Sequence, residues 1–579
     1  MDRRTVLAFV LIGLILVLMP YYMRFIYGDD YQDSQFVSED VSELSPATNP
    51  RGSSTPTATP SNRSNRSNRS TQSSQLDNAS LPSTSSEPAL SLNFEPQDIL
   101  VDTERFQATL STRGGLITSW KLKSHLTKSG EWLELISDGG QGLGLSIQDQ
   151  SLDNLEFQAS GTHLSMFGDQ QDELILRANS SFGTVEKRIR FQGNRYHIQL
   201  SVSVENLPRD ADLSLRWNGA LADTEETAGE AGGFYETNYE QVVTYAGGEV
   251  EVWDLARIQD DEEPPSGQIT WVGVRNKYFL SAIIPSDGRY VLKLDGTSAP
   301  DASGIDRPNF DVHLVSDNPD NVMTTDLFIG PISYTDLRNQ NQSLDGRTRE
   351  LDLDEFVDYG PSFLRTILKP VTILIVQLFL AIHKLVPNYG VVIILFSLIV
   401  KIVVFPLTHK SLESAAKMAK MQPRIAELKE KIKDSQKMNE AMMKLYKEEK
   451  INPLGGCLPM LLQMPILFSL FSLFRGTIEL RHANFTLWIT DLSQPEFIMI
   501  GGFALHVLPL LMGISMFIQQ KMTMKDPKQA ALVYIMPVFL TYIFWTMSSG
   551  LVFYYTLYNV TTLLQQIIME RTKTFLGTK

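Results

Sequence analysis

The sequence predicts a multi-domain membrane protein in which a six-helix α transmembrane bundle carries a large antiparallel β-sandwich. Long apolar runs fill the last third of the 579-residue chain, and short alternating runs fill its middle. From Pro361 onward there are 23 Lys and Arg against 12 Asp and Glu, whereas residues 1–360 carry 28 against 54. This difference in charge indicates that the two parts meet different surroundings.

Residues 1–27 are predicted to form an uncleaved signal anchor. Arg3 and Arg4 precede an apolar run from Val6 to Met19, and basic flanks of this kind stay in the cytoplasm. No small-x-small cleavage site follows, although a cleaved signal peptide is the alternative. Residues 28–92 are rich in Ser, Thr, Asn and Pro. We expect a disordered linker there, because so few apolar side chains cannot offset the entropy of the chain.

Residues 93–354 are predicted to form the β-sandwich domain. Apolar and polar residues alternate in segments such as Tyr196–Val204 and Tyr290–Leu294, and turn clusters such as Asp138-Gly-Gly separate these segments. Alternation with a period of two, interrupted by turns, is typical of antiparallel sheets that bury one face.

Five apolar runs after residue 386 are long enough to cross a bilayer, since about 20 apolar residues span the hydrocarbon core. With the signal anchor they give six spans. The five runs are Tyr389–Leu407, Leu458–Phe474, Ile498–Ile518, Ala531–Thr546 and Gly550–Ile568. Residues 361–386 are also apolar but contain Pro370, His383 and Lys384. We expect an amphipathic helix lying at the outer interface, and a further span is the alternative.

The charges of the loops support six spans. Basic residues concentrate in 408–452, in 519–529 and in the short tail 571–579, which the positive-inside rule assigns to the cytoplasm. Both termini are then cytoplasmic, and the acidic sandwich lies outside.

Lys401 lies inside the apolar segment Val391–Leu407, and a charge within hydrocarbon costs about 2.5–3.5 kcal/mol. Ser397 is one turn earlier on the same helix face. The other predicted spans contain no Asp or Glu away from their ends. One interpretation is that both residues face a wet intramembrane groove. The other is that Lys401 extends to the cytoplasmic headgroups.

A polar stripe follows one face of the last predicted span. Its members are Tyr555, Asn559, Thr562 and Gln566. Hydrogen bonds between packed helices are one explanation. The other is that the stripe forms one wall of a hydrophilic groove, to which Gln463 and Ser469 would add.

Residues 408–452 are predicted to form a cytoplasmic helical hairpin that breaks at Asp434-Ser435. Apolar residues recur at helical spacing on both sides of the break, and they include Met418, Met421, Met438 and Met442. Such a stripe usually forms the seam between two helices. The alternative is that these flexible, polarizable side chains receive varied apolar segments.

No cofactor, nucleotide, nucleic-acid or metal site is expected. The chain lacks GxxxxGK[ST], GxSxG and dinucleotide-binding glycine patterns, and neither the eight histidines nor Cys457 have metal-ligand spacing. A secondary transporter would need paired repeats or acidic residues in the spans. A membrane-anchored enzyme with a sugar-binding sandwich would need a carboxylate pair, and none is recognisable.

Several motifs resemble those of the YidC insertase family, which includes the mitochondrial oxidase-assembly and chloroplast thylakoid insertases. The resemblance covers residues 355–570 most strongly, and the sandwich is similar to the periplasmic domain of Gram-negative members. The motifs are Phe405-Pro-Leu-Thr408, Asn452-Pro-Leu-Gly-Gly-Cys-Leu-Pro459, Leu462-Gln-Met-Pro465, Leu487-Trp-Ile-Thr-Asp-Leu492 and Ser549-Gly-Leu-Val-Phe-Tyr-Tyr555.

The resemblance implies an inner-membrane protein insertase and chaperone that is not an enzyme, with an insertase core at 387–570. It implies a groove open to the cytoplasm and to lipid, with Lys401 at the position where the family usually has arginine. Ser397 lies where the family is expected to have a small hydroxyl residue, and Tyr555 matches the family's groove tyrosine. The implied partners are nascent membrane proteins, the Sec translocon, ribosomes and the bilayer.

Overall fold

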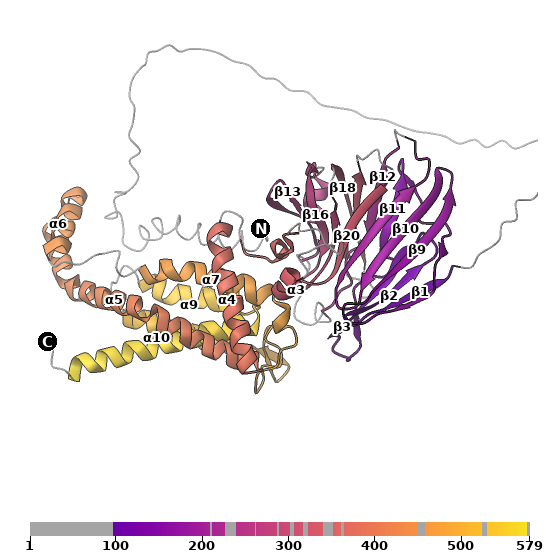
Figure 1. The fold of residues 1–579 in the computed structure, drawn as a ribbon. Coiled ribbons are helices and arrows are strands. Elements are labelled where there is room, and N and C mark those ends of the chain that lie inside the picture. Colours follow the sequence, from indigo (N-terminus) through magenta and orange to yellow (C-terminus); the bar gives the residue numbers. More distant parts are fainter. Residues whose placement is uncertain are drawn as a thin grey trace, which may run out of the picture.

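The computed structural model describes residues 96–208, 211–225, 239–260, 262–286, 289–300, 306–316, 322–339, 351–360, 364–432, 434–448, 458–523 and 530–575. A β-rich domain and a helical bundle lie end to end (Figure 1). The predicted signal anchor and linker lie outside the described residues.

An 11-stranded and a 9-stranded sheet form the predicted sandwich, and neighbouring strands are antiparallel except for the parallel pair β1–β8. The larger sheet contains β1 (Asp98–Asp102), β2 (Phe106–Ser111), β3 (Leu116–Leu126), β4 (Trp132–Glu134), β5 (Gln141–Ile147), β6 (Gln150–Ser151), β8 (His163–Ser165), β12 (Leu213–Asn218), β15 (Ser266–Gly267), β18 (Tyr290–Pro300) and β19 (Asp306–Ser316). The smaller sheet contains β7 (Gln158–Ala159), β9 (Gln171–Ser180), β10 (Gly183–Gln192), β11 (His197–Val204), β13 (Gln241–Ala246), β14 (Glu249–Trp253), β16 (Ile269–Arg275), β17 (Phe279–Pro285) and β20 (Val322–Pro331).

Strand β2 shows how the sequence pattern produces the sandwich. Phe106, Ala108 and Leu110 are buried, and the residues between them are only half-buried, as a period of two requires. Phe106 stacks on Trp120 of β3 with 3.8 Å between ring centroids. These side chains belong to one large apolar core shared by the two sheets.

The sandwich continues slightly beyond the predicted end at residue 354. The short helices α2 (Leu255–Gln259), α3 (Tyr334–Asn339) and η1 (Leu353–Phe356) accompany the sheets. Phe356 belongs to the sandwich core and stacks on Trp271 of β16 at 3.7 Å. The segment after the last strand is therefore part of this domain and leads directly into the bundle.

A buried lysine joins the two sheets. Nζ of Lys187 on β10 donates hydrogen bonds to the carbonyl oxygens of Gly114 (2.6 Å), Gly115 (3.1 Å) and Leu143 (2.7 Å). Both glycines have positive φ (68° and 58°), which glycine adopts without strain. Burial lowers the pKa of Lys187 to about 7. The charged form of the side chain has three N–H donors, and the three carbonyl oxygens can accept one hydrogen bond from each.

Replacing Lys187 is expected to destabilise the sandwich strongly. Lys187→Met should lower its free energy of unfolding by about 3–5 kcal/mol, because three buried carbonyls lose a charged donor. Urea denaturation of the full chain in detergent, followed by the β-sheet circular dichroism signal, measures this change. The matched control is Arg188→Met on the neighbouring, 46% exposed side chain, which should cost at most about 1 kcal/mol. Equal losses in the two variants would contradict the role of Lys187.

The bundle is built from long helices after residue 364. They are α4 (Arg365–Leu385), α5 (Tyr389–Lys431), α6 (Ser435–Glu448), α7 (Leu458–Gly476), the short η4 (Ile478–Leu480), α8 (Val507–Thr523), α9 (Ala530–Phe544) and α10 (Ser549–Phe575). Helix α5 is continuous over 43 residues, so a predicted span and the first half of the predicted hairpin are one helix. The Asn388 side chain caps its start by accepting a hydrogen bond from the Val391 N–H.

The prediction of a helix over Ile498–Ile518 is wrong at its start. Strands β21 (Ile498–Ile500) and β22 (Phe503–Leu505) form a hairpin, and α8 begins only at Val507. Gly501 and Gly502 turn the chain with φ of 58° and 83°, which is the geometry of a tight two-residue hairpin turn. This Gly-Gly pair indicates a turn, but it lies within an apolar run that is long enough for a span, and the run as a whole predicts a helix.

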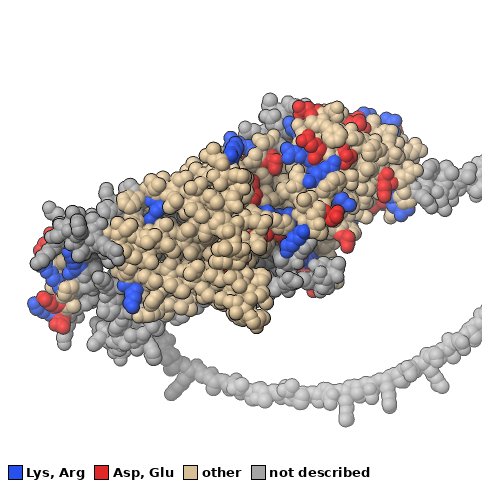
Figure 2. Space-filling view, turned by 90° about the horizontal axis from the view of Figure 1, so that it is seen from below, with Lys and Arg blue, Asp and Glu red and all other residues tan. Residues whose placement is uncertain are grey.

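The surface of the bundle suits lipid. Figure 2 shows it as a broad band nearly free of charged side chains between two charged ends. Large apolar side chains such as Ile402, Val403 and Val538 are more than two-thirds exposed. Among the described residues, α4 alone is both long and apolar enough to cross a membrane by length and composition. Shorter apolar helical segments are Tyr389–Phe405, Met464–Gly476, Val507–Met522 and Val533–Phe544.

Helix α4 covers most of the segment predicted to lie at the outer interface. Figure 1 shows it crossing the direction that α5 and α10 share. Its first turns are tied to the end of the sandwich, because Lys369 donates to Glu355 at 2.6 Å and Arg365 also pairs with Glu355. The crossing direction agrees with an interfacial helix, and its placement in the bilayer stays a prediction.

Candidate functional site

Lys401 lies on α5 with its side chain buried between α5 and α10. Its Nζ donates a hydrogen bond to Oγ1 of Thr562 at 2.7 Å and lies 4.9 Å from the centroid of the Tyr558 ring. The residue is 8% exposed. The ammonium group therefore points into the bundle toward α10.

The hydroxyl group of Thr562 is oriented to receive this cation. Its Oγ1 donates to the carbonyl oxygen of Tyr558 at 2.7 Å, so its own proton is occupied and its lone pairs face Lys401. The Tyr558 ring adds a π face, which attracts a cation. Tyr558 was missed by sequence reasoning, although it lies one turn before Thr562 on the same helix.

The other predicted groove residues lie in the same part of the bundle, but their side chains make different contacts. Ser397 is buried, but its hydroxyl donates to the Ile394 carbonyl of its own helix at 2.7 Å. Tyr555 packs edge-on against Phe544 of α9, with 5.2 Å between ring centroids. Asn559 is half-buried and Gln566 is buried. The side chain of Gln463 lies outside the described residues.

Helix α10 presents more hydrogen-bonding groups than its packing uses. The hydroxyls of Tyr554 and Tyr555 and the amide of Gln565 are buried without a hydrogen-bond partner in the described part of the chain. Gln565 follows Tyr558 by seven residues and so lies on the same helix face. Buried polar groups normally have a partner, so this face can bind water or polar groups from outside the bundle.

The predicted methionine stripe lies mostly at the contact between α5 and α6. Met421 and Ile425 of α5 are buried against Met442, Leu445 and Tyr446 of α6. Met438 is also buried, and the side chain of Met418 lies outside the described residues. These contacts fit the simpler interpretation, in which the stripe is the seam between two helices.

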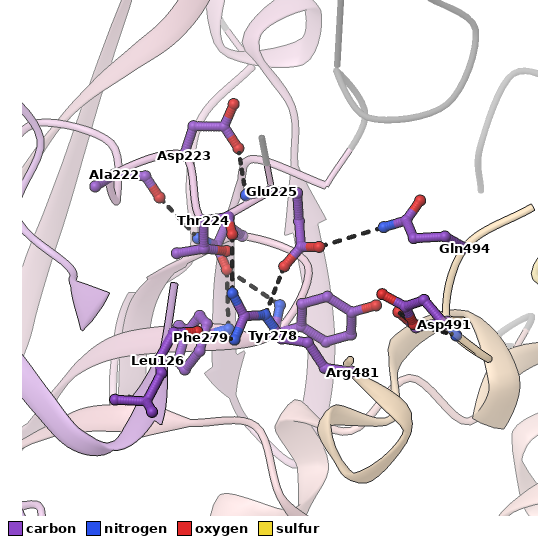
Figure 3. Close-up of polar contacts among 12 residues, drawn as sticks. Leu126, Ala222, Asp223, Thr224, Glu225, Tyr278, Phe279, Arg481, Asp491 and Gln494 are labelled. Atoms are coloured by element: carbon purple, nitrogen blue, oxygen red, sulfur yellow. Dashed lines mark hydrogen bonds and ion pairs between the residues drawn. The ribbon is translucent and has the colours of Figure 1, made fainter. Parts of the chain in front are cut away.

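A second polar cluster joins the bundle to the sandwich (Figure 3). Nε of Arg481, in the loop after α7, donates to Glu225 at 2.7 Å, and both side chains are only 5% exposed. The same guanidinium donates to the carbonyl oxygens of Leu126 and Thr224 at 3.0 Å each. Gln494, in the same loop, donates to the second oxygen of Glu225 at 3.2 Å.

The contacts around this pair are apolar as well as polar. Ile478 of η4 belongs to the core of the sandwich, whereas Tyr334 of α3 belongs to the core of the bundle. His125 of β3 packs edge-on against Phe279, over which Arg481 lies. Burial and the guanidinium groups of Arg481 and Arg105 lower the pKa of His125 to about 4. The sandwich and the loop after α7 thus share a desolvated interface.

The fold and these sites define the class of protein: a membrane protein in which a large β-rich domain is joined to an apolar helical bundle. Residues 98–374 match the family model of the YidC periplasmic domain, and residues 381–575 match that of the 60Kd inner membrane protein. The chain belongs to the YidC family of membrane protein insertases. Its sandwich is therefore the periplasmic domain of an inner-membrane protein.

Curated relatives cover nearly the whole chain. Membrane protein insertase YidC of Pelobacter propionicus is 34% identical over 84% of this chain and 89% of its own length. The protein of the same name from Chlorobium limicola is 30% identical over 99% of this chain and 95% of its own. A crystal structure of an active YidC insertase aligns with 81% of this chain and 92% of that one, at 18% identity and a TM-score of 0.33.

Proposed function

We propose that this protein inserts hydrophobic segments into the inner membrane through a hydrated groove beside Lys401. The observation that carries the proposal is a buried ammonium group contacting only neutral partners in the described part of the chain, Thr562 and Tyr558. A cation at this depth is costly in lipid and is retained where water or an anionic group can reach it.

The polar face of α10 supports the same groove. The unpartnered Tyr555 hydroxyl and Gln565 amide offer hydrogen bonds to water or to a client's backbone. A polar, acidic client tail that enters this groove avoids much of the desolvation cost of crossing lipid. The client's apolar segment then leaves along the exposed apolar faces of the helices, and burial of about 20 apolar residues in lipid drives the step.

The resemblance to the family and the sequence support the remaining features of the proposal. The insertase works alone or with the Sec translocon, receives clients from ribosomes and uses no nucleotide, because no nucleotide-binding motif occurs in the sequence. The helical hairpin and both termini lie in the cytoplasm. The protein acts as a chaperone of membrane-protein folding rather than as an enzyme.

Reconstitution tests the proposal. The purified full chain in liposomes, without nucleotide or other protein, should insert a single-span client with an acidic N-terminal tail. Protection of that tail from added protease measures insertion. Liposomes that contain heat-denatured chain are the control. Insertion that does not exceed this control, or that requires ATP, would contradict the proposal.

A further inference from the structure

The hairpin of β21 and β22 exposes an unusual amount of apolar surface. Phe497, Met499, Ile500 and Phe503 are each 50–62% exposed. From Phe497 to Leu505 the sequence is FIMIGGFAL, which contains no polar side chain. A loop of this composition in water would be a site of aggregation or a binding surface.

The position of the hairpin indicates what it contacts. The loop between α7 and the hairpin is docked on the periplasmic sandwich through Arg481, so the hairpin lies at the periplasmic end of the bundle. His506, directly after β22, lies 4.7 Å from Trp545 just beyond the end of α9, measured between ring centroids. Tryptophan at the end of an apolar helix is typical of the membrane–water interface. The base of the hairpin is therefore level with the periplasmic headgroup region.

The apolar surface of the hairpin also continues onto a lipid-facing helix. Leu511, Ile514 and Ile518 form an exposed stripe along α8 at i, i+3 and i+7. Helix α8 starts two residues after β22, and Glu496, just before the hairpin, accepts a hydrogen bond from the Leu508 N–H at 2.7 Å. The hairpin and the first turns of α8 are thus held together.

We propose that this hairpin inserts its apolar side chains into the periplasmic leaflet and anchors the outer end of α8. The backbone geometry limits the depth. A two-stranded ribbon leaves both outer edges without backbone partners, which hydrocarbon does not tolerate. The ribbon therefore lies in the headgroup region with its side chains reaching the acyl chains. This lipid contact depends on the periplasmic placement of the sandwich and is independent of insertion activity.

Site-specific fluorescence tests the proposal. In a Cys457→Ser background, Met499→Cys is labelled with the environment-sensitive dye NBD, and the full chain is reconstituted into vesicles of phosphatidylethanolamine and phosphatidylglycerol. The lipid-facing reference is Ile514→Cys on α8. The aqueous reference is Asp172→Cys, an exposed residue of β9. Strand β9 lies on the side of the sandwich away from the bundle (Figure 1).

The expected result at Met499 is a blue-shifted emission and strong quenching by doxyl-labelled lipid, close to the values at Ile514. Iodide in the buffer should quench the dye weakly there and strongly at Asp172. Iodide quenching at Met499 that equals quenching at Asp172 would overturn the proposal. A blue shift without doxyl quenching, growing with the ratio of protein to lipid, would also overturn it by indicating contact with a second copy.

Discussion

Lys401→Ala is expected to lower insertion of a client with an acidic N-terminal tail about tenfold, equivalent to about 1.4 kcal/mol. The substitution removes the only charge that the described structure buries between α5 and α10, and with it the attraction for the tail. Lys401→Arg keeps the charge and should retain most activity, although the fork geometry of arginine changes the contact with Thr562. The rate of tail translocation in the reconstituted assay measures both variants.

Two controls separate this effect from a general loss of basic charge or of packing. Lys521→Ala removes an exposed lysine from the last turn of α8 and should leave insertion unchanged. A client with a neutral tail should be affected less by Lys401→Ala than the acidic client. If Lys401→Ala inserts the acidic client as fast as the wild type, the groove needs no cation and the proposed route has no basis.

Thr562 and Tyr558 explain why the sequence revealed the site only in part. Lys401 stands out because a charge interrupts an apolar run, and Thr562 stands out by its helical spacing from Tyr555. Their contact, by contrast, joins residues 161 positions apart and depends on how α5 packs on α10. Local pattern contains no information about such packing, so the pairing required the structure.

The hairpin before α8 illustrates a different limit. Composition and length predicted a span, and these criteria do not distinguish an apolar hairpin followed by a helix from one longer helix. The Gly501-Gly502 pair was the available signal, since glycine tolerates the positive φ that a tight turn requires. The sandwich was predictable because apolar and polar residues alternate along strands such as β2, and this pattern is visible in the sequence.

Arg481→Met is expected to weaken the docking of the sandwich on the bundle by about 3–5 kcal/mol. Removing one partner of a buried pair leaves the desolvated Glu225 carboxylate without the guanidinium group that pairs with it. The Arg481→Met, Glu225→Met double variant should recover much of this loss, because two apolar side chains can fill the same space. Thermal unfolding of the full chain in detergent measures the effect. Arg113→Met, which breaks an exposed pair with Glu156, should cost at most about 1 kcal/mol.

The fold around the same interface should lose stability in acid. His125 has a pKa of about 4 in the folded protein, where it lies beside Arg481, and an ordinary value of 6.5 in the unfolded chain. Between these values the unfolded chain binds a proton that the folded protein does not, so the folded protein loses stability as pH falls from 6.5 toward 4. A His125→Phe variant, which keeps a ring against Phe279, should lose less stability over this range. Equal acid sensitivity in both proteins would assign the effect to other groups. If thermal unfolding finds Arg481→Met as stable as Arg113→Met, the buried Arg481–Glu225 pair does not hold the two domains together.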